Sequence, residues 1–330
     1  MNKRELVLNA LNNRPVDRVP VSFWFHFVSE EEKRQGLARP ELIERNVDGH
    51  RRYCAAVQPD FIKIMSDGYF GYPAGDEQAP LIRNLDDFER LQPLSIDHPW
   101  IQGQIALVKR VTALQPDTMY FYNVFGPLTV LKHLAGQERV IEWLKTAPEK
   151  TSAVLLRMAR GIALQAEQVI KAGGADGIYL SVQNPDISRI SDEEYHSIVS
   201  PADRFVLDAA NRAANGADGN NILHICGFEG CKNHLEAWTG YPAKAYSVAV
   251  NVEGVSLLEC KRIFGGAAII GGFANTKDSP LYRGSRAEVE RITEELIAGA
   301  GKQGILLGAD CSVPADFAFE RLDWIRQKAM

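Results

Sequence analysis

The sequence has few cysteines and no long apolar run. Five cysteines among 330 residues form an odd set without the spacing of a disulfide framework, which is typical of reduced thiols. No stretch approaches the ~18 consecutive apolar residues of a transmembrane helix, and the first residues have helical periodicity rather than a signal-peptide core. We therefore expect a cytoplasmic protein with no membrane partner.

A basic surface and the common catalytic motifs are also missing. The 37 basic and 42 acidic side chains give a formal net charge of −5 without any run rich in lysine or arginine, so nucleic acid is not an expected partner. We find no His-Glu-x-x-His, no Gly-x-Ser-x-Gly, no phosphate loop, and no Gly-x-Gly-x-x-Gly after a strand. The function must be inferred from the side chains at a site.

Eight β-rich apolar runs alternate with helical patterns along the chain. The runs span residues 19–25, 61–65, 119–123, 177–182, 222–226, 245–250, 267–271 and 305–308. The helical patterns span residues 30–58, 86–115, 127–173, 191–215, 232–238, 256–264, 285–301 and 315–328. This alternation after a leading helix predicts an α/β fold, a (β/α)₈ TIM barrel with an extra N-terminal helix, and residues 1–330 as a single domain.

Several helix boundaries support the alternation. Ser285 with Glu288, and Ser191 with Glu194, have the Ser-x-x-Glu spacing of a capping box. The pattern at 127–173 is too long for one barrel helix, and we expect Pro148 to divide it.

Polar residues follow most of the predicted strands. TIM-barrel enzymes carry their chemistry at the carboxyl ends of the strands, so these side chains predict the rim of a pocket. They are His26, Ser66, Asp67, Asn123, Gln183, Asn184, His224, Cys226, Asn251, Asn275, Asp310 and Cys311.

Three of these residues have the chemistry of metal ligands. His224 and Cys226 are two positions apart at the end of one strand, so they point to the same side. Cys311 follows the last strand, where alternation places it on one face with Ile305, Leu307 and Ala309. Three nitrogen and sulfur ligands with one open position are typical of a catalytic zinc site.

Other interpretations of these residues remain open. A histidine in an apolar strand is usually a hydrogen-bonded core residue, and a buried cysteine usually acts as a small apolar side chain. Cys231 and His234 offer a local alternative ligand pair. Asp67 could cap a following helix, and His26 could pack in an aromatic wall.

The sequence resembles the uroporphyrinogen decarboxylase superfamily, especially its zinc-dependent corrinoid:thiol methyltransferase branch. The resemblance rests on segments 14–21, 65–67, 123–129, 264–266, 284–289 and 308–314, and on His224-x-Cys226 with the distant Cys311. It implies the same barrel, with Zn²⁺ on these three residues. Decarboxylases of the family carry an arginine-rich segment that grips carboxylates, and residues 23–27 here read Phe-Trp-Phe-His-Phe instead.

The resemblance also implies a reaction. A methyl group would pass from a methylated corrinoid (cobamide) to a small thiol activated on zinc. We expect the corrinoid on a separate protein, because this chain has no Asp-x-His-x-x-Gly motif. Asp67, Asn123 and Gln183 would orient the substrate, and the fourth zinc position would belong to Glu253, water or substrate.

Three other functions stay open at this stage. They are a metal-free decarboxylase of the same family, a zinc hydrolase that activates water, and a non-catalytic tetrapyrrole-binding protein.

Overall fold

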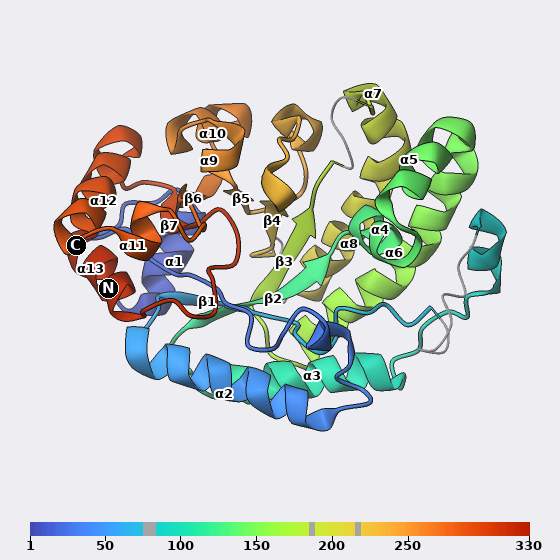
Figure 1. Ribbon diagram of the computed structural model, residues 1–330, viewed down its shortest axis with the longest axis horizontal. Coiled ribbons are helices and arrows are strands. Elements are labelled where there is room, and N and C mark those ends of the chain that lie inside the picture. The colour runs from blue at the N-terminus through green and yellow to red at the C-terminus, as the bar shows by residue number, and fades with distance from the viewer. Residues whose placement is uncertain (75–83, 185–188, 215–218) are drawn as a thin grey trace.

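A computed structural model describes residues 1–74, 84–184, 189–214 and 219–330 (Figure 1). Its centre is one parallel sheet whose strands are hydrogen-bonded in sequence order. The strands are β1 (Phe61–Ile64), β2 (Met119–Phe125), β3 (Gly177–Val182), β4 (Ile222–Ile225), β5 (Ala245–Val248), β6 (Ala268–Phe273) and β7 (Ile305–Ala309). Seven of the eight predicted strands are thus confirmed.

The predicted first strand, residues 19–25, is wrong as a strand. This segment forms only isolated bridges, one of them between Val21 and Leu307 of β7. On its other side, the backbone N–H of Asp60, next to β1, donates to the Val21 carbonyl oxygen over 3.1 Å. The segment therefore lies between the two edge strands of the sheet without completing a regular ladder.

In this segment, side-chain oxygens accept hydrogen bonds from backbone N–H groups that a regular strand ladder would need. Pro20 has no N–H. The Val21 N–H donates to the Asp60 carboxylate over 2.9 Å, and the Phe23 N–H donates to the Tyr53 hydroxyl over 3.0 Å. These contacts fix the segment in place of strand pairing.

The sheet curls around one apolar interior, as in a TIM barrel. All seven strands contribute to it, through Phe61, Met119, Phe121, Tyr179, Ile222, Ala245, Ala268, Ile270 and Leu306. Trp24 joins them from segment 19–25. Helix α1 (Lys3–Leu11) covers the amino-terminal ends of the strands with Val7, Ala10 and Leu11. A cavity lies at the opposite end, beside the carboxyl ends of the strands.

Helices surround the sheet on its outer side (Figure 1). The longer ones are α2 (Pro40–Val57), α3 (Pro99–Thr112), α4 (Pro127–Ala135), α5 (Gln137–Thr146), α6 (Pro148–Lys171), α8 (Ser200–Ala213), α10 (Leu257–Ile263), α12 (Arg286–Ala300) and α13 (Glu320–Lys328). Short pieces are α7 (Asp192–Glu194), α9 (Val250–Glu253), α11 (Pro280–Arg283), a π-turn at Tyr195–Val199, and 3₁₀ turns at Glu32–Arg34, Leu85–Arg90, Phe228–Gly230 and Leu235–Trp238.

The predicted helix boundaries hold in part. Pro148 begins α6, as expected, but Gly136 adds a second break by adopting a φ of 86° between α4 and α5. The capping box of Ser191 and Glu194 is complete, whereas at Ser285 only the bond from the Glu288 N–H is present. The predicted helix at 232–238 is only a 3₁₀ turn.

Across the described residues, no helix combines the length and apolar character needed to span a membrane.

Candidate metal centre

His224, Cys226 and Cys311 lie together at the carboxyl end of the barrel. One ligand atom from each falls in a group whose members are all within 4.8 Å of one another. The two Sγ atoms are 3.8 Å apart. Two thiolates at about 2.3 Å from a tetrahedral zinc would be about 3.8 Å apart, so this spacing fits one shared ion. Within the described residues, no other group of His, Cys, Asp and Glu side chains could hold a metal in this way.

Cys311 reaches this group by a different route from the predicted one. Leu306 points into the interior cluster, while Ile305, Leu307 and Ala309 belong to the outer core, so the predicted face was wrong. The strand ends at Ala309, and the chain bends at the next two residues. The bend, rather than strand alternation, turns the thiol toward β4.

The imidazole of His224 is held with one nitrogen free of protein partners. Its Nδ1 lies 3.1 Å from Ser247 Oγ on the neighbouring strand β5, where the two residues are register partners. Its Nε2 is buried and has no hydrogen-bond partner among the described residues. Burial lowers the pKa of His224, which favours the neutral ring that a metal requires. A bare buried nitrogen beside two thiols fits a metal ligand better than a core histidine.

The two thiols share their electrostatic environment. Their mutual hydrogen bond holds the pKa of Cys311 well below its usual range and raises the pKa of Cys226. One sulfur therefore ionises before the other. A bound cation would favour the loss of both protons.

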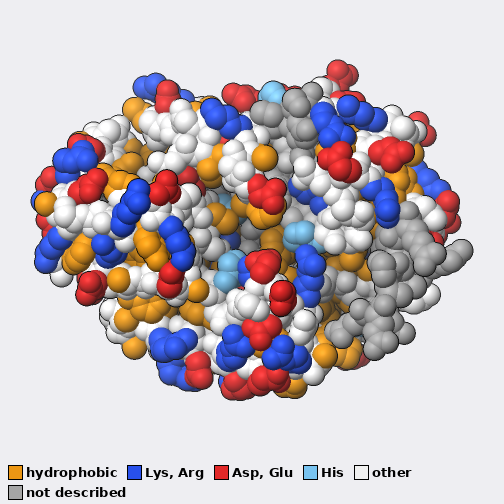
Figure 2. Space-filling model, in the orientation of Figure 1, with side chains coloured by type: hydrophobic (Ala, Val, Ile, Leu, Met, Phe, Trp, Pro, Cys, Tyr) orange, Lys and Arg blue, Asp and Glu red, His pale blue; other side chains and the backbone are white. Residues whose placement is uncertain are grey.

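A cavity of about 340 Å³ opens above these three residues. Figure 2 shows it as a hollow at the centre of the face, with histidine, lysine or arginine side chains in its wall. Its charged or polar lining includes His26, Glu30, Lys33, Arg34, Lys63, Asn123, Thr129, Lys132, His133, Gln183 and Ser312. Among the described residues of this lining, lysine and arginine side chains outnumber carboxylates, because Glu30 is the single carboxylate and it pairs with Lys33.

Two buried lysines of this cavity were not predicted from the sequence. Lys63 is 4% exposed and Lys132 is 8% exposed, and burial lowers the pKa of each to about 8. A signal for Lys63 was available, because a lysine at the middle of the apolar run 61–65 must face either the barrel interior or the outer core. Lys132 had no such signal, since a lysine in a helix is ordinarily exposed.

The predicted orienting residues differ in their access to the cavity. Asn123 and Gln183 line it, and Asn123 is held by hydrogen bonds with Ser66 and Ser181. Asp67 does not line it. Its carboxylate is fully buried.

Asp67 acts on the cavity through a neighbour. One of its carboxylate oxygens lies 2.7 Å from Nδ1 of His26, and the other accepts the Phe27 N–H over 2.7 Å. His26 lines the cavity, with its side chain 25% exposed. Asp67 thus fixes the orientation of His26, and it does not cap a following helix.

Glu253 is engaged away from the three ligand atoms. Both of its carboxylate oxygens accept from Asn233, one from the backbone N–H and one from the side-chain amide. Asn233 also donates to the Cys226 carbonyl oxygen over 3.1 Å. Glu253 therefore supports the loop that carries Cys226, and a fourth protein ligand is missing from the described residues near the site.

Asp310 and the alternative ligand pair also lie outside the group. Asp310 accepts from the Asn251 side chain over 3.0 Å, and burial raises its pKa to about 6. Cys231 is exposed, and His234 Nδ1 lies 3.6 Å from Asp192. Neither Cys231 nor His234 shares the centre of His224.

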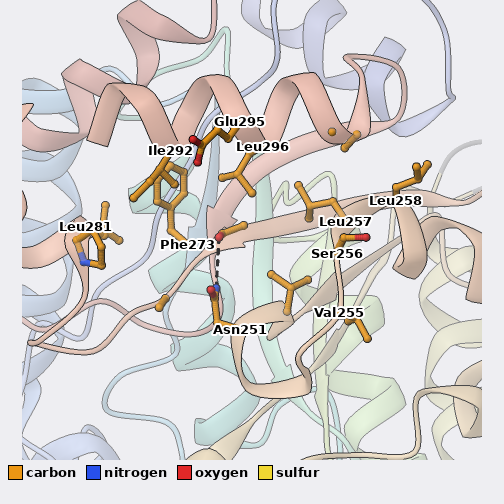
Figure 3. A pocket seen from close by; sticks show the side chains of 16 residues that line it. Asn251, Val255, Ser256, Leu257, Leu258, Phe273, Leu281, Ile292, Glu295 and Leu296 are labelled. Atoms are coloured by element: carbon orange, nitrogen blue, oxygen red, sulfur yellow. Dashed lines mark hydrogen bonds between the residues drawn. The ribbon is translucent and has the colours of Figure 1, made fainter. Parts of the chain in front are cut away.

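A larger cavity, of about 620 Å³, lies on the outer side of the sheet (Figure 3). Its walls come from β6, α9, α10, α11 and α12, and they are mainly apolar, with Phe273, Ile292 and Leu296 among the labelled side chains. Glu295 at its edge pairs with Arg291 on the surface. Because the described residues of this cavity include no cluster of reactive groups, the chemistry is assigned to the smaller cavity above His224.

The fold and site together define a class of protein, a TIM-barrel-like α/β protein whose strand ends present one imidazole and two thiols to a cationic cavity. The profile of the uroporphyrinogen decarboxylase (URO-D) family matches residues 72–328. The chain belongs to this family, and the resemblance seen in its sequence is confirmed.

The named relatives include methyltransferases. The chain is 36% identical over 102 residues to the methylated-thiol–coenzyme M methyltransferase of Methanosarcina mazei, a match to 31% of this chain and 26% of that protein. The matched part is thus about a quarter of the relative's length. A solved structure of a methyltransferase from Methanosarcina mazei superposes with a TM-score of 0.75 at 16% identity, covering 100% of this chain and 98% of that one.

A B12-independent methionine synthase from Shewanella sp. W3-18-1 also shares the fold. Its TM-score is 0.59 at 12% identity, over 94% of this chain and 97% of that chain. At these identities, the two structural likenesses establish the barrel fold alone.

Proposed function

We propose that this protein is a zinc-dependent methyltransferase that moves a methyl group from a methylated corrinoid to a small thiol. The observation that carries the proposal is the donor set at the cavity floor. His224 offers a bare, buried Nε2, and the sulfur atoms of Cys226 and Cys311 have the separation expected of two ligands on one tetrahedral ion.

Zinc would supply Lewis acidity at this position, because a thiol bound to it is ionised at neutral pH, whereas a free thiol with a pKa of about 8.5 is mostly protonated. The protein's residues would do the rest. His224 as a neutral ligand and two cysteine thiolates balance the double charge of the ion. The cavity then gives the acceptor sulfur the one open position.

The cavity's charge supports an acceptor with an anionic group. Lys132 and Arg34 line it without a carboxylate partner among the described residues, while Lys33 is neutralised by Glu30. The coenzyme M named for the Methanosarcina mazei relative is a thiol cofactor, which agrees with a thiol as acceptor. We propose a small anionic thiol as the acceptor of this protein.

The three orienting residues take two roles in the proposal. Asn123 and Gln183 present side-chain amides to the cavity and would hold polar groups of the substrate. Asp67 is a positioning residue, since it reaches the cavity only through His26. Holding the sulfur and the methyl group in line is the main demand of such a displacement.

The methyl donor would arrive on a separate corrinoid protein that docks at the open end of the barrel. The sequence contains no Asp-x-His-x-x-Gly motif with which to carry a corrinoid itself. A cytoplasmic location, which would keep both thiols reduced, completes the proposal.

Methyl transfer can be tested directly. Zinc-loaded protein, methylcobalamin and a mercaptoalkane sulfonate should give the methyl thioether and demethylated cobalamin, and His224→Ala should reduce the rate to background. Cys231→Ser serves as the matched control, because this exposed thiol lies outside the site, and it should retain the wild-type rate. Ester hydrolysis or porphyrinogen decarboxylation without thioether formation would contradict the proposal and favour a hydrolase or a decarboxylase. Corrinoid binding that is indifferent to His224→Ala, without any turnover, would favour a non-catalytic tetrapyrrole-binding protein.

A further inference from the structure

Lys63 occupies an unusual place in the barrel. It lies on β1, is 4% exposed, and its ammonium group stands over the ring of Tyr179 at 4.2 Å and near the ring of Trp24 at 5.3 Å. Both rings also contact the imidazole of His224, with centroid separations of 5.5 Å for Tyr179 and 6.4 Å for Trp24. The ammonium and the imidazole are thus held by the same two aromatic side chains.

The Lys63 ammonium group has no carboxylate partner in the part of the chain that the structure describes. Among the described residues, neither a salt bridge nor a hydrogen bond joins its ammonium group to an acceptor. Lys63 lines the same cavity as Cys226 and Cys311. Burial lowers the pKa of Lys63, and the opposing, smaller influences come first from these two thiols and then from Asp67. By contrast, Lys33 in the same cavity stands over the ring of Phe70 and pairs with Glu30.

We propose that Lys63 is the counter-charge for the acceptor thiolate at the metal centre. This inference rests on the zinc-dependent function proposed above. With a divalent ion on neutral His224 and two cysteine thiolates, the centre is neutral. An acceptor thiol bound in the open position would release its S–H proton to solvent, so that its sulfur anion would leave the centre with one negative charge. The Lys63 ammonium balances that charge in a part of the barrel where water screens it poorly.

A lysine at this position therefore favours the binding of an anionic sulfur over the binding of a neutral ligand. A neutral donor in the open position would gain nothing from Lys63, because the centre would stay neutral. The aromatic rings of Tyr179 and Trp24 hold the ammonium by cation–π attraction without neutralising its charge. A carboxylate partner would cancel the effect.

The test uses a neutral thiol, so that the other cations of the cavity have no anionic tail to bind. Protein loaded with Co²⁺ in place of zinc is titrated with 2-mercaptoethanol at pH 7, and binding is followed by the sulfur-to-cobalt charge-transfer absorption. Lys63→Met keeps the length of the side chain and removes the charge. We expect its affinity for 2-mercaptoethanol to fall about tenfold or more, with unchanged cobalt content.

Two comparisons separate this effect from a general disturbance of the site. Imidazole, a neutral donor, should bind the cobalt forms of wild type and Lys63→Met with equal affinity. Lys277→Met is the matched lysine variant, since Lys277 also stands over an aromatic ring, that of Tyr282, but lies outside this cavity, and it should bind 2-mercaptoethanol as wild type does. If Lys63→Met does not fold, Lys63→Gln takes its place with the same expected loss.

Wild-type affinity of the Lys63 variants for 2-mercaptoethanol would overturn the inference, and so would an equal loss of imidazole affinity. These results leave the zinc-dependent function intact, because they concern protein that holds metal. Failure of the wild-type protein to retain any metal would refute the proposed function itself.

Discussion

Ser247→Ala tests the orientation of the His224 imidazole in the proposed metal centre. Ser247 Oγ lies 3.1 Å from His224 Nδ1, and we infer that Nδ1–H donates to it, which leaves Nε2 as the ligand atom. Alanine removes the acceptor, so the ring loses its fixed tautomer and Nδ1–H is buried without a partner. Loss of such a supporting contact typically weakens metal affinity by about 10- to 100-fold.

The assay is a competition for zinc between the protein and a chromophoric chelator at pH 7, with the thermal stability of the metal-free proteins measured in parallel. Ser181→Ala is the matched control. Ser181 and Ser247 are the register partners of His224 on the two neighbouring strands, but Ser181 bonds to Asn123 instead of the imidazole. We expect zinc affinity close to wild type for Ser181→Ala. Equal affinities for the two variants would refute the assigned role of Ser247.

Three further predictions concern stability. Burial raises the pKa of Asp203 from its ordinary value of 3.8 to about 7, and the Tyr195 hydroxyl donates a hydrogen bond to its carboxylate over 3.0 Å. The folded state therefore binds this proton more tightly than the unfolded state. The free energy of unfolding of the wild type should fall by up to about 4 kcal/mol as the pH rises from about 4 to about 7. Chemical denaturation of Asp203→Asn should show no such fall. Gly49→Ala would place Cβ 2.1 Å from the ring of Phe27. We expect the free energy of unfolding, measured with urea, to fall by about 1–3 kcal/mol or more. Gly299→Ala meets nothing within 4 Å in helix α12, and the same measurement should show a gain of up to about 1 kcal/mol, whereas a loss there would contradict the open space around Gly299.

Seven strands could be predicted because a buried parallel sheet requires continuous apolar runs, which stand out between helical patterns. The segment 19–25 has the same composition but fails to pair regularly. Its backbone donors are taken by Asp60 and Tyr53, which are distant in sequence. Composition alone does not reveal which acceptor a given N–H will find.

The grouping of the three candidate ligands was predictable where residue chemistry is rare and local. His224-x-Cys226 places two soft donors on one side of a strand end, and few structural roles require that pair. Cys311 was chosen by the family resemblance and by a strand-face argument; the structure contradicts the face argument, although the bend after β7 brings the thiol to the same place. A bend of this kind depends on loop geometry, which the alternation of side chains does not describe.

The supporting residues depend on three-dimensional contacts. Ser247 matters because strand register sets it beside His224, and Asn233 matters because its loop folds back onto Glu253 and the Cys226 carbonyl. Lys63 is the exception, since a lysine inside an apolar strand is itself a signal of a special environment.

The most direct test of the account is the zinc content of the purified protein after extensive dialysis, measured for wild type, Cys311→Ser and Cys231→Ser. Cys311 belongs to the proposed centre, while Cys231 is exposed and outside it. The account predicts one zinc ion per chain for wild type and Cys231→Ser, and substantially less for Cys311→Ser. Equal zinc in all three proteins, or loss of zinc in Cys231→Ser alone, would contradict it.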